Sequence, residues 1–414
     1  MHNGNGNSPE RVRPYSKVLR VVTRLNIGGP SMHVVLLLRE LSDHGYDTTL
    51  AAGTCEAADG DMTYLLNDED CVRWIPELSR SVNPWKNLRA LVRLCRVIRR
   101  ERPDIVHTHT AMAGCLGRTA ALLSGVPIVV HTFHGNSLRG YFSPLVGRAF
   151  LYIERFLAKH TDAICVVCEQ QLSELSEGFG IAPRNRFRVM PLGLDLSPFL
   201  ALRSPETTEK RLRVGWFGRL VPIKNIGLLL DVMEATLRRS DAIEFHVAGD
   251  GPERELMRAA AGRFGPRLVW HGWQKDITPL VEKCHVLIQT SHNEGTPVAL
   301  IQGMAGARPF ISTAAGGVVN MVDGPALRTA NGCSWHANGI LAEPKGEAFA
   351  DALIELQKRN ELAAAMGERA RQFASVRYSK ETLLAGIDSL YRELSRSKVL
   401  EDATREHAPM CFDK

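Results

Sequence analysis

Short apolar runs and longer helical patterns alternate along the first half of the chain. A β-rich run over 17–26 ends at Gly28-Gly29-Pro30, and a helical pattern over 31–45 follows it and stops at Gly45. Further short runs at 48–53, 103–110 and 127–135 predict strands, and the segments at 80–102 and 113–125 between them predict helices. Strands that alternate with helices of about ten to fifteen residues predict a parallel sheet that is covered on both faces.

The same alternation starts again after a polar stretch at 198–210, which predicts a linker between two domains. Strand patterns follow at 213–218, 243–249, 268–273, 286–291 and 309–317. Helical patterns lie between them, one with Asn225 as its N-cap and one with Pro252 in its first turn. A last helical segment covers 382–400. The chain is therefore predicted to be an α/β protein with two similar doubly wound domains.

Length and composition agree with this organisation. We expect a disordered tail over 1–16, one domain over 17–200, a second over 211–378 and a closing helical segment over 379–400. A chain of 414 residues with 44% hydrophobic and 23% charged residues is typical of a two-domain globular protein. No apolar run reaches the roughly 18 residues that a membrane span needs, and the N-terminal residues lack the apolar core of a secretory signal. We therefore expect a cytoplasmic protein.

The nine cysteines show no regular spacing. The closest pair, Cys165 and Cys168, lies in a segment that is predicted to be a buried strand. Residues three apart on a strand point to opposite faces, so these two side chains cannot share a metal ion. We expect small core residues here, not a redox or zinc site.

The net charge of +6 is partly concentrated on one predicted helix. The cations Lys86, Arg89, Arg93, Arg96 and Arg100 are spaced by three and four residues, which places them in one stripe. A second face carries Leu88, Leu91, Val92, Cys95 and Ile98, and we expect it to pack on the sheet. The stripe is either an ordinary solvated face or a surface that attracts anionic lipid or a phosphorylated acceptor. Stacking aromatics and nucleic-acid motifs are missing, so we expect no nucleic-acid partner.

Four histidines stand near the ends of two predicted strands, His107 and His109 on one, His131 and His134 on the next. No carboxylate accompanies them at ligand spacing, so we predict no metal site. We expect His107 and His131 to be buried and hydrogen-bonded. His134 precedes Gly135 at the strand end, where the ligand crevice of a parallel sheet lies. Its ring can bond a phosphate oxygen or a substrate hydroxyl there.

Three segments have the residues that bind phosphate groups. Gly28 and Gly29 join a strand to a helix, where backbone N–H groups can approach a phosphate, although the spacing matches neither GxGxxG nor a Walker loop. Arg219 and Lys224 in "GRLVPIKN" suit a diphosphate leaving group. In "NEGTP", Thr296 as N-cap and Pro297 at the first helical position predict a helix whose N-terminus is a second anion site.

These segments together resemble a known family. "GGP", "HTFHG", "GRLVPIKN", "GDGP" and "EGTPVALIQGMAGARPFISTAAGG" occur in the order and at the distances of the family 4 retaining glycosyltransferases of the GT-B fold. The resemblance covers roughly 18–391. It implies two Rossmann-like doubly wound domains that face each other across a cleft. A stretch over 140–164 also resembles a bacterial branch that builds cell-surface polysaccharides and related glycans.

The resemblance implies roles for individual residues. The N-terminal domain would bind the acceptor, a glycan or a lipid-linked molecule, and the C-terminal domain a nucleotide-sugar, often a UDP-sugar. Arg219 and Lys224 would hold the diphosphate, with help from the Gly28-Gly29 loop. Glu294 would bond the sugar hydroxyls, His134 would line the reaction centre, and the backbone near Trp273 would meet the base. The donor set is completed by Gly218, Gly251, Gly295, Thr296, Pro297, Val298 and Gln302. The last helix would cross back onto the N-terminal domain.

No cofactor is implied, because the nucleotide-sugar is a substrate. No metal is implied either, since cationic side chains and helix dipoles neutralise the diphosphate.

Gln302 departs from the family pattern, which has a second glutamate eight residues after the first. A carboxylate can accept two hydrogen bonds from the ribose diol, whereas an amide accepts with its oxygen and donates with its nitrogen. The change loses a charge-assisted bond of about 1–3 kcal/mol. It predicts weaker donor binding, another nucleotide preference, or neither where neighbours compensate.

The expected reaction keeps the anomeric configuration. The sugar–phosphate bond loosens, the cations and the helix N-terminus stabilise the diphosphate, and the acceptor hydroxyl attacks from the same face. A double displacement is disfavoured because no residue clearly serves as the nucleophile. Two other functions stay open. One is a nucleotide-sugar epimerase of similar shape, and the other is a sugar-nucleotide-binding protein that has lost turnover through Gln302.

Overall fold

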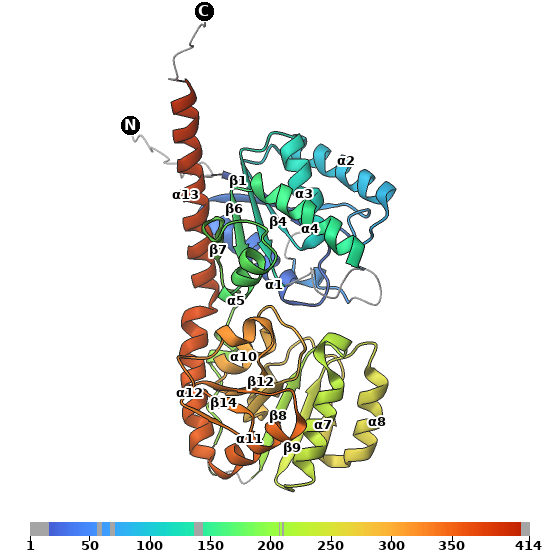
Figure 1. Cartoon of the computed structure of the whole chain (residues 1–414), viewed down its shortest axis with the longest axis vertical. Helices are drawn as coiled ribbons and strands as arrows, with labels where there is room; N and C mark the ends of the chain where they lie inside the picture. The colour runs from blue at the N-terminus through green and yellow to red at the C-terminus, as the bar shows by residue number, and fades with distance from the viewer. Residues whose placement is uncertain are drawn as a thin grey trace, which may run out of the picture. The chain divides into compact units, whose positions relative to one another are not determined.

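A computed structural model describes residues 16–55, 60–66, 71–135, 144–206, 208 and 211–406. The chain forms two compact units (Figure 1). The first unit comprises 1–132, 156–164 and 387–414, and the second comprises 133–155 and 165–386. The tail predicted over 1–16 lies outside the described residues except for Ser16. The other predicted domain boundaries stay predictions, since each compact unit is assembled from separated stretches of chain.

The first sheet has seven strands in the order β3-β2-β1-β4-β5-β6-β7. The strands are β1 (Ser16–Val22), β2 (Tyr46–Ala52), β3 (Val72–Trp74), β4 (Ile105–His109), β5 (Ile128–Phe133), β6 (Ala163–Val166) and β7 (Phe187–Val189). β1 pairs in parallel with β2 on one side and with β4 on the other. The predicted parallel, doubly wound organisation is confirmed. Its helices are α1 (Gly29–Glu40), α2 (Pro84–Glu101), α3 (Ala111–Leu123), α4 (Pro144–Lys159) and α5 (Glu169–Ser173).

Helix α2 corrects one prediction. Asn83 caps its N-terminus by accepting from the backbone N–H groups of Trp85 and Lys86. The side that packs into the core carries Ala90, Leu94, Cys95 and Ile98. Leu88 and Val92, which were predicted to belong to this side, are 50% and 41% exposed. The predicted face was centred too close to Leu88 and Val92. The buried side is centred between Leu94 and Ile98, roughly 100° around the helix from Leu88.

The second sheet has eight strands in the order β10-β9-β8-β11-β12-β15-β14-β13. They are β8 (Leu212–Phe217), β9 (Ile243–Ala248), β10 (Leu268–Trp270), β11 (Val286–Gln289), β12 (Phe310–Thr313), β13 (Arg328–Ala330), β14 (Cys333–Trp335) and β15 (Gly339–Ala342). The first five and β15 pair in parallel, whereas β14 runs antiparallel to both of its neighbours. The antiparallel edge was not predicted.

The second sheet is covered by α7 (Ile226–Leu237), α8 (Arg254–Phe264), α9 (Thr278–Lys283), α10 (Val298–Ala305), α11 (Gly346–Lys358) and α12 (Asn360–Arg377). Asn225 caps α7 as predicted, since its Oδ1 accepts from the N–H of Leu228 at 3.2 Å. The short helix α6 (Ser197–Leu200) occupies the start of the predicted linker and buries Phe199. None of the helices in the described part of the chain is both long and apolar enough to cross a membrane.

The last helix, α13 (Lys380–Glu406), extends six residues beyond the predicted end at Leu400. From Ile387 onwards it belongs to the first unit. There Tyr391 is fully buried, and its hydroxyl meets Nδ1 of His107 at 2.6 Å and accepts from the guanidinium of Arg20 at 3.2 Å. Tyr46 donates to Asp388 at 2.8 Å one turn earlier. These contacts fasten the helix to the first sheet.

Both sheets reverse their strand order beside the first strand. In the first sheet β1 lies between β2 and β4, and in the second β8 lies between β9 and β11. At such a reversal the loops that leave neighbouring strands turn to opposite faces, which leaves a crevice at the carboxyl ends. The loops that follow β8 and β11 therefore share one edge of the second sheet, and they contain Arg219, Lys224 and Glu294.

Candidate donor-sugar and diphosphate site

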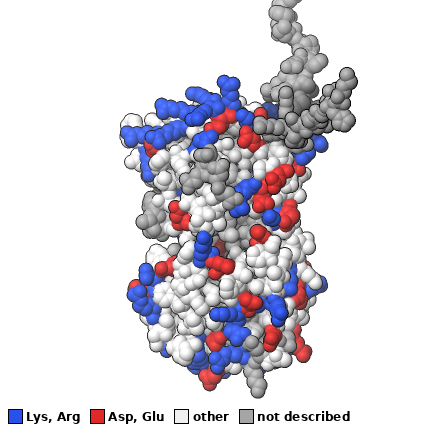
Figure 2. All heavy atoms as spheres, turned by 180° about the vertical axis from the view of Figure 1, so that it is seen from behind, with Lys and Arg blue, Asp and Glu red and all other residues white. Residues whose placement is uncertain are grey.

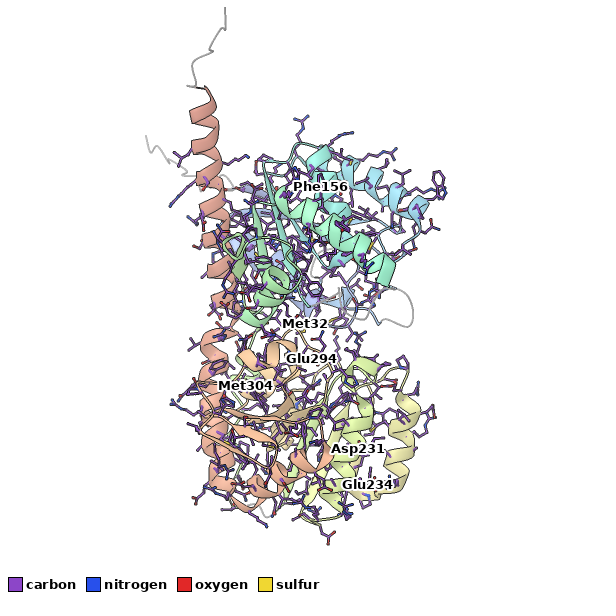
Figure 3. All side chains as sticks on the ribbon, viewed as in Figure 1. Met32, Phe156, Asp231, Glu234, Glu294 and Met304 are labelled. Carbon is purple, nitrogen blue, oxygen red and sulfur yellow. The ribbon has the colours of Figure 1, made fainter. Side chains whose placement is uncertain are left out.

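A carboxylate and a cation meet at the reversal point of the second sheet. Lys224 ends a short 3-10 turn after β8, and Glu294 lies five residues after the end of β11 (Figure 3). The Nζ of Lys224 lies 2.5 Å from Oε1 of Glu294. Their side chains are 18% and 10% exposed. Two of the predicted site residues, 70 positions apart in sequence, are thus brought into contact.

Two further side chains hold the same carboxylate oxygen. Ser291 donates to Oε1 of Glu294 at 2.5 Å, and Nε2 of Gln289 donates to it at 3.0 Å. The second hydrogen of that Nε2 is directed at the hydroxyl of Ser291, 2.9 Å away. All hydrogen bonds and the ion pair that the described residues make with this carboxylate end on Oε1. Its other oxygen, Oε2, is left to accept hydrogen bonds from a ligand.

Sequence reasoning missed Gln289 and Ser291. A signal for them existed, because "VLIQTS" is a buried strand that ends in an amide, and residues 289 and 291 point to the same face of an extended chain. A glutamine that is 1% exposed at the end of an apolar strand needs a hydrogen-bonding partner. The predicted set already contained the partner, Glu294.

Glycines let the Glu294 loop pack closely. A Cβ added to Gly295 would lie 2.4 Å from the carbonyl oxygen of His134, and one added to Gly317 would lie 1.8 Å from the carbonyl oxygen of Gly295. Any side chain at either position would force backbone to move. Gly295, a predicted site residue, therefore allows this loop to pack directly against the backbone of His134.

The helix start after this loop differs from the prediction. Helix α10 begins at Val298, and Pro297 is its extended N-cap residue without a side-chain cap. Thr296 was predicted to be the N-cap, but its hydroxyl oxygen is buried and finds no hydrogen-bond partner among the described residues. The first N–H groups of α10 therefore lack a side-chain cap, which leaves them and the Thr296 hydroxyl available to an anion.

The side chains of Gln302, Arg219 and Trp273 form no hydrogen bond or ion pair with Lys224 or Glu294 among the described residues. Gln302 lies in the second turn of α10, partly buried, and its side chain makes no hydrogen bond to the described residues. Arg219 follows Gly218 directly after β8 and is partly buried. Gly251 packs against the carbonyl oxygen of Leu220 in the same group of loops. Trp273, after β10, is 47% exposed.

The Gly28-Gly29 loop belongs to the first unit. Gly29 is the first residue of α1, and Gly28 precedes it as the N-cap residue without a side-chain cap. The loop follows β1 at the reversal point of its own sheet. The first turn of α1 has no side-chain cap, and anion binding at this loop stays a prediction.

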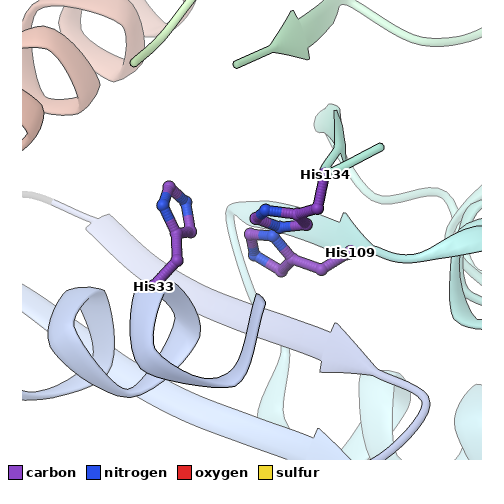
Figure 4. Close-up of side chains that lie close together, drawn as sticks. All are labelled: His33, His109 and His134. Atoms are coloured by element: carbon purple, nitrogen blue, oxygen red, sulfur yellow. The ribbon is translucent and has the colours of Figure 1, made fainter. Parts of the chain in front are cut away.

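Two of the four predicted histidines are confirmed as core residues. His107 and His131 are fully buried and hydrogen-bonded, His107 to Thr132 at 2.7 Å and His131 to Thr108 at 2.8 Å. Figure 4 shows the other two with His33, and one ring nitrogen of each lies within 4.8 Å of the others. His33 was not predicted, because nothing in an apolar helix pattern marks it. Burial lowers the pKa of His134 to about 4, so this ring is neutral at pH 7 and able to accept a hydrogen bond.

Two family models match separate parts of this chain. Residues 28–193 match the family model described as "Glycosyl transferase 4-like domain", and residues 211–359 match "Glycosyl transferases group 1". The chain is 29% identical over 269 residues to the UDP-Gal:alpha-D-GlcNAc-diphosphoundecaprenol alpha-1,3-galactosyltransferase of Escherichia coli, covering 61% of this chain and 68% of that protein. It is 24% identical to an uncharacterised glycosyltransferase of Methanocaldococcus jannaschii, covering 89% of this chain and 95% of that protein.

Solved structures show the same fold. HepE of Anabaena in complex with UDP superposes with a TM-score of 0.73 at 18% identity, covering 91% of this chain and all of that one. The sucrose-phosphate synthase of Thermosynechococcus elongatus gives a TM-score of 0.74 at 17% identity, covering 92% and 99%. These similarities confirm the predicted GT-B fold with its two Rossmann-like sheets.

Proposed function

Since this chain belongs to the family 4-like glycosyltransferases of the GT-B fold, we propose that it moves a sugar from a UDP-sugar to an acceptor hydroxyl with retention of configuration. The observation that supports this most directly is the contact of Lys224 and Glu294 at the reversal point of the second sheet. A diphosphate needs cations, and a sugar needs hydrogen-bond acceptors. This pair offers both within one contact distance.

The chemistry follows from what each group does. Departure of the diphosphate builds negative charge, which Arg219, Lys224 and the uncapped N-terminus of α10 stabilise. Glu294 binds sugar hydroxyls through Oε2 and so fixes the sugar over the departing phosphate. The acceptor hydroxyl attacks from the face that the diphosphate leaves, and its proton passes to that phosphate. His134, neutral at pH 7, accepts a hydrogen bond from a substrate hydroxyl. We propose that no metal ion takes part.

For the acceptor we propose a lipid-linked glycan in cell-surface polysaccharide or glycoconjugate synthesis. The relative from Escherichia coli bears a name that states a diphosphoundecaprenol acceptor. Helix α2 supports such an acceptor through its outer face. Five arginines are exposed there: Arg89, Arg93, Arg96, Arg99 and Arg100. Figure 2 shows Lys and Arg side chains gathered on one part of the surface of the first unit. Such a face attracts anionic lipid, so we place the enzyme at the cytoplasmic membrane surface.

The solvent side of α2 is also apolar. Trp85 is 75% exposed, and Leu88 and Val92 continue from it at helical spacing. The next acidic residue along the chain is Glu101, so residues 80–100 contain cations only among their charged side chains. An aromatic and aliphatic stripe beside a cationic one is typical of a helix that lies in a membrane interface.

A thermal-shift series with UDP, GDP, ADP and CMP, each in the presence of a chelator, tests the donor proposal. A nucleotide at about 100 times its dissociation constant stabilises the folded protein by about 2.7 kcal/mol. We expect UDP to raise the Tm and Lys224→Met to abolish the shift. A shift with another nucleotide instead would name another donor, and no shift with any of them would overturn the proposal. Incubation with UDP-sugars without acceptor then looks for an epimer, whose formation would favour an epimerase.

A further inference from the structure

Gln289 is a buried polar residue whose presence the core does not explain. It is the last residue of β11, 1% exposed, and follows the apolar residues Val286, Leu287 and Ile288. Its Oε1 is buried and has no hydrogen-bond partner among the described residues. A buried amide oxygen without a partner destabilises the fold, and the hydrogen bonds of the amide nitrogen have to offset that cost. Those bonds go to Ser291 and Glu294.

The orientation of this amide follows from its neighbours. If its oxygen and nitrogen were exchanged, Oε1 would lie 3.0 Å from a carboxylate oxygen, and two acceptors would face each other. The Nε2 therefore points to Glu294. One of its hydrogens bonds Oε1 of the carboxylate and the other bonds Ser291, whose own hydroxyl hydrogen bonds the same Oε1. The three side chains form a closed ring of hydrogen bonds.

We propose that Gln289 is a positioning residue for the donor sugar, and that with Ser291 it locks the Glu294 carboxylate so that Oε2 faces the sugar hydroxyls. The proposal rests on the proposed donor site. Lys224 alone could not fix the carboxylate, because a flexible ammonium group allows it to rotate and also serves the diphosphate. Gln289 at the end of β11 and Ser291 just after it are both buried, and their two hydrogen bonds hold the carboxyl group in one orientation. Selectivity among donor sugars then depends on Gln289 through the orientation that it gives to Glu294.

Gln289→Leu tests this, since it removes both N–H donors and keeps a similar volume. We expect kcat/KM for the preferred UDP-sugar to fall roughly tenfold to hundredfold, the equivalent of one hydrogen bond to a charged group. Discrimination within a panel of UDP-glucose, UDP-galactose and UDP-N-acetylglucosamine should fall with it. The dissociation constant of UDP, which has no sugar for Glu294 to hold, should stay within about twofold of the wild-type value. Gln372→Leu, at an exposed position on α12, is the matched control.

Gln289→Glu adds a readout that a packing role would not give. Its introduced carboxylate faces Glu294, and like charges repel, so transfer at neutral pH should be weaker than in Gln289→Leu. At lower pH the introduced carboxyl is protonated and donates one hydrogen bond again. Its kcat/KM relative to the wild type should therefore rise as the pH falls, whereas that of Gln289→Leu should not.

The outcomes separate the two proposals. If the wild type binds neither UDP nor a UDP-sugar, the donor site itself is wrong. If it binds both, and Gln289→Leu changes UDP affinity and sugar transfer equally or changes neither, Gln289 is structural and the positioning role is overturned.

Discussion

The hydroxyl of Tyr391 lies 2.6 Å from Nδ1 of His107, a residue 284 positions earlier in the chain. The same hydroxyl accepts a hydrogen bond from Nη1 of Arg20. Arg20 is fully buried, and its Nε and Nη2 find no partner among the described residues. The closing helix therefore gives a hydrogen-bond partner to two buried side chains of the first sheet.

Tyr391→Phe should destabilise the protein by about 1–3 kcal/mol, because it leaves Arg20 and His107 without this partner in a site that water does not reach. Urea unfolding measures the loss. Tyr152→Phe removes a hydroxyl from a side chain that is 70% exposed, and its effect should stay within about 0.5 kcal/mol. Equal effects of the two variants would show that the Tyr391 hydroxyl contributes nothing specific.

A double-mutant cycle on Lys224 and Glu294 should show coupling. The variants Lys224→Met, Glu294→Gln and the pair of both should give a coupling free energy of about 0.5–3 kcal/mol in unfolding, since both side chains are largely buried. The exposed pair Lys345 and Glu343, 72% and 53% exposed, serves as the control and should give less than about 1 kcal/mol. Additive effects at the first pair would mean that their contact carries no energy.

The sequence predicted most of the parallel strands, because each of those is part of an apolar run bounded by turn or helix signals. It missed β3 and β7 in the first sheet and β13, β14 and β15 in the second, whose three or four residues are too few to show a period. It assigned Leu88 and Val92 to the core of α2, because sequence alone does not separate a buried apolar position from an exposed one on the same helix. The motifs located Lys224 and Glu294, and the fold then shows that Gln289 bonds the same carboxylate oxygen as Lys224.

Gln302→Glu should strengthen donor binding. The introduced carboxylate would accept charge-assisted hydrogen bonds from the ribose diol, which predicts about tenfold tighter UDP binding with little change in kcat. Titration calorimetry and steady-state kinetics measure the two quantities. Gln372→Glu introduces the same charge on the exposed side of α12 and should change neither. A gain of about a hundredfold in kcat would instead identify the natural chain as a binding protein with a degraded active site.

The low pKa of His134 predicts a pH effect with a definite sign. Burial lowers this pKa from 6.5 to about 4, so between these values the unfolded chain binds a proton that the folded chain does not. The free energy of unfolding that the neutral His134 ring contributes is complete above pH 6.5. It falls as the pH decreases from 6.5 towards 4 and is constant below that. Wild type and His134→Gln, unfolded by urea at several pH values, should therefore differ in slope across this window. Parallel curves would mean that His134 titrates normally in the folded protein.

The outer face of α2 should decide membrane binding. Trp85→Ser combined with Leu88→Ser removes apolar side chains that are 75% and 50% exposed, so the fold should remain while vesicle binding weakens. Arg89→Glu combined with Arg96→Glu should weaken it by about 1 kcal/mol or more for each residue, and only where the vesicles contain phosphatidylglycerol.

Cosedimentation with phosphatidylcholine vesicles, with and without phosphatidylglycerol, measures both effects. Added salt should reduce the contribution of the arginines but not that of Trp85 and Leu88, because screening acts on charge and not on apolar contact. Leu256→Ser, at a position on α8 that is 46% exposed, is the control and should bind like the wild type. If the Trp85 and Leu88 variant also binds like the wild type, the apolar stripe of α2 is an ordinary solvated surface, and the lipid-linked acceptor loses its structural support.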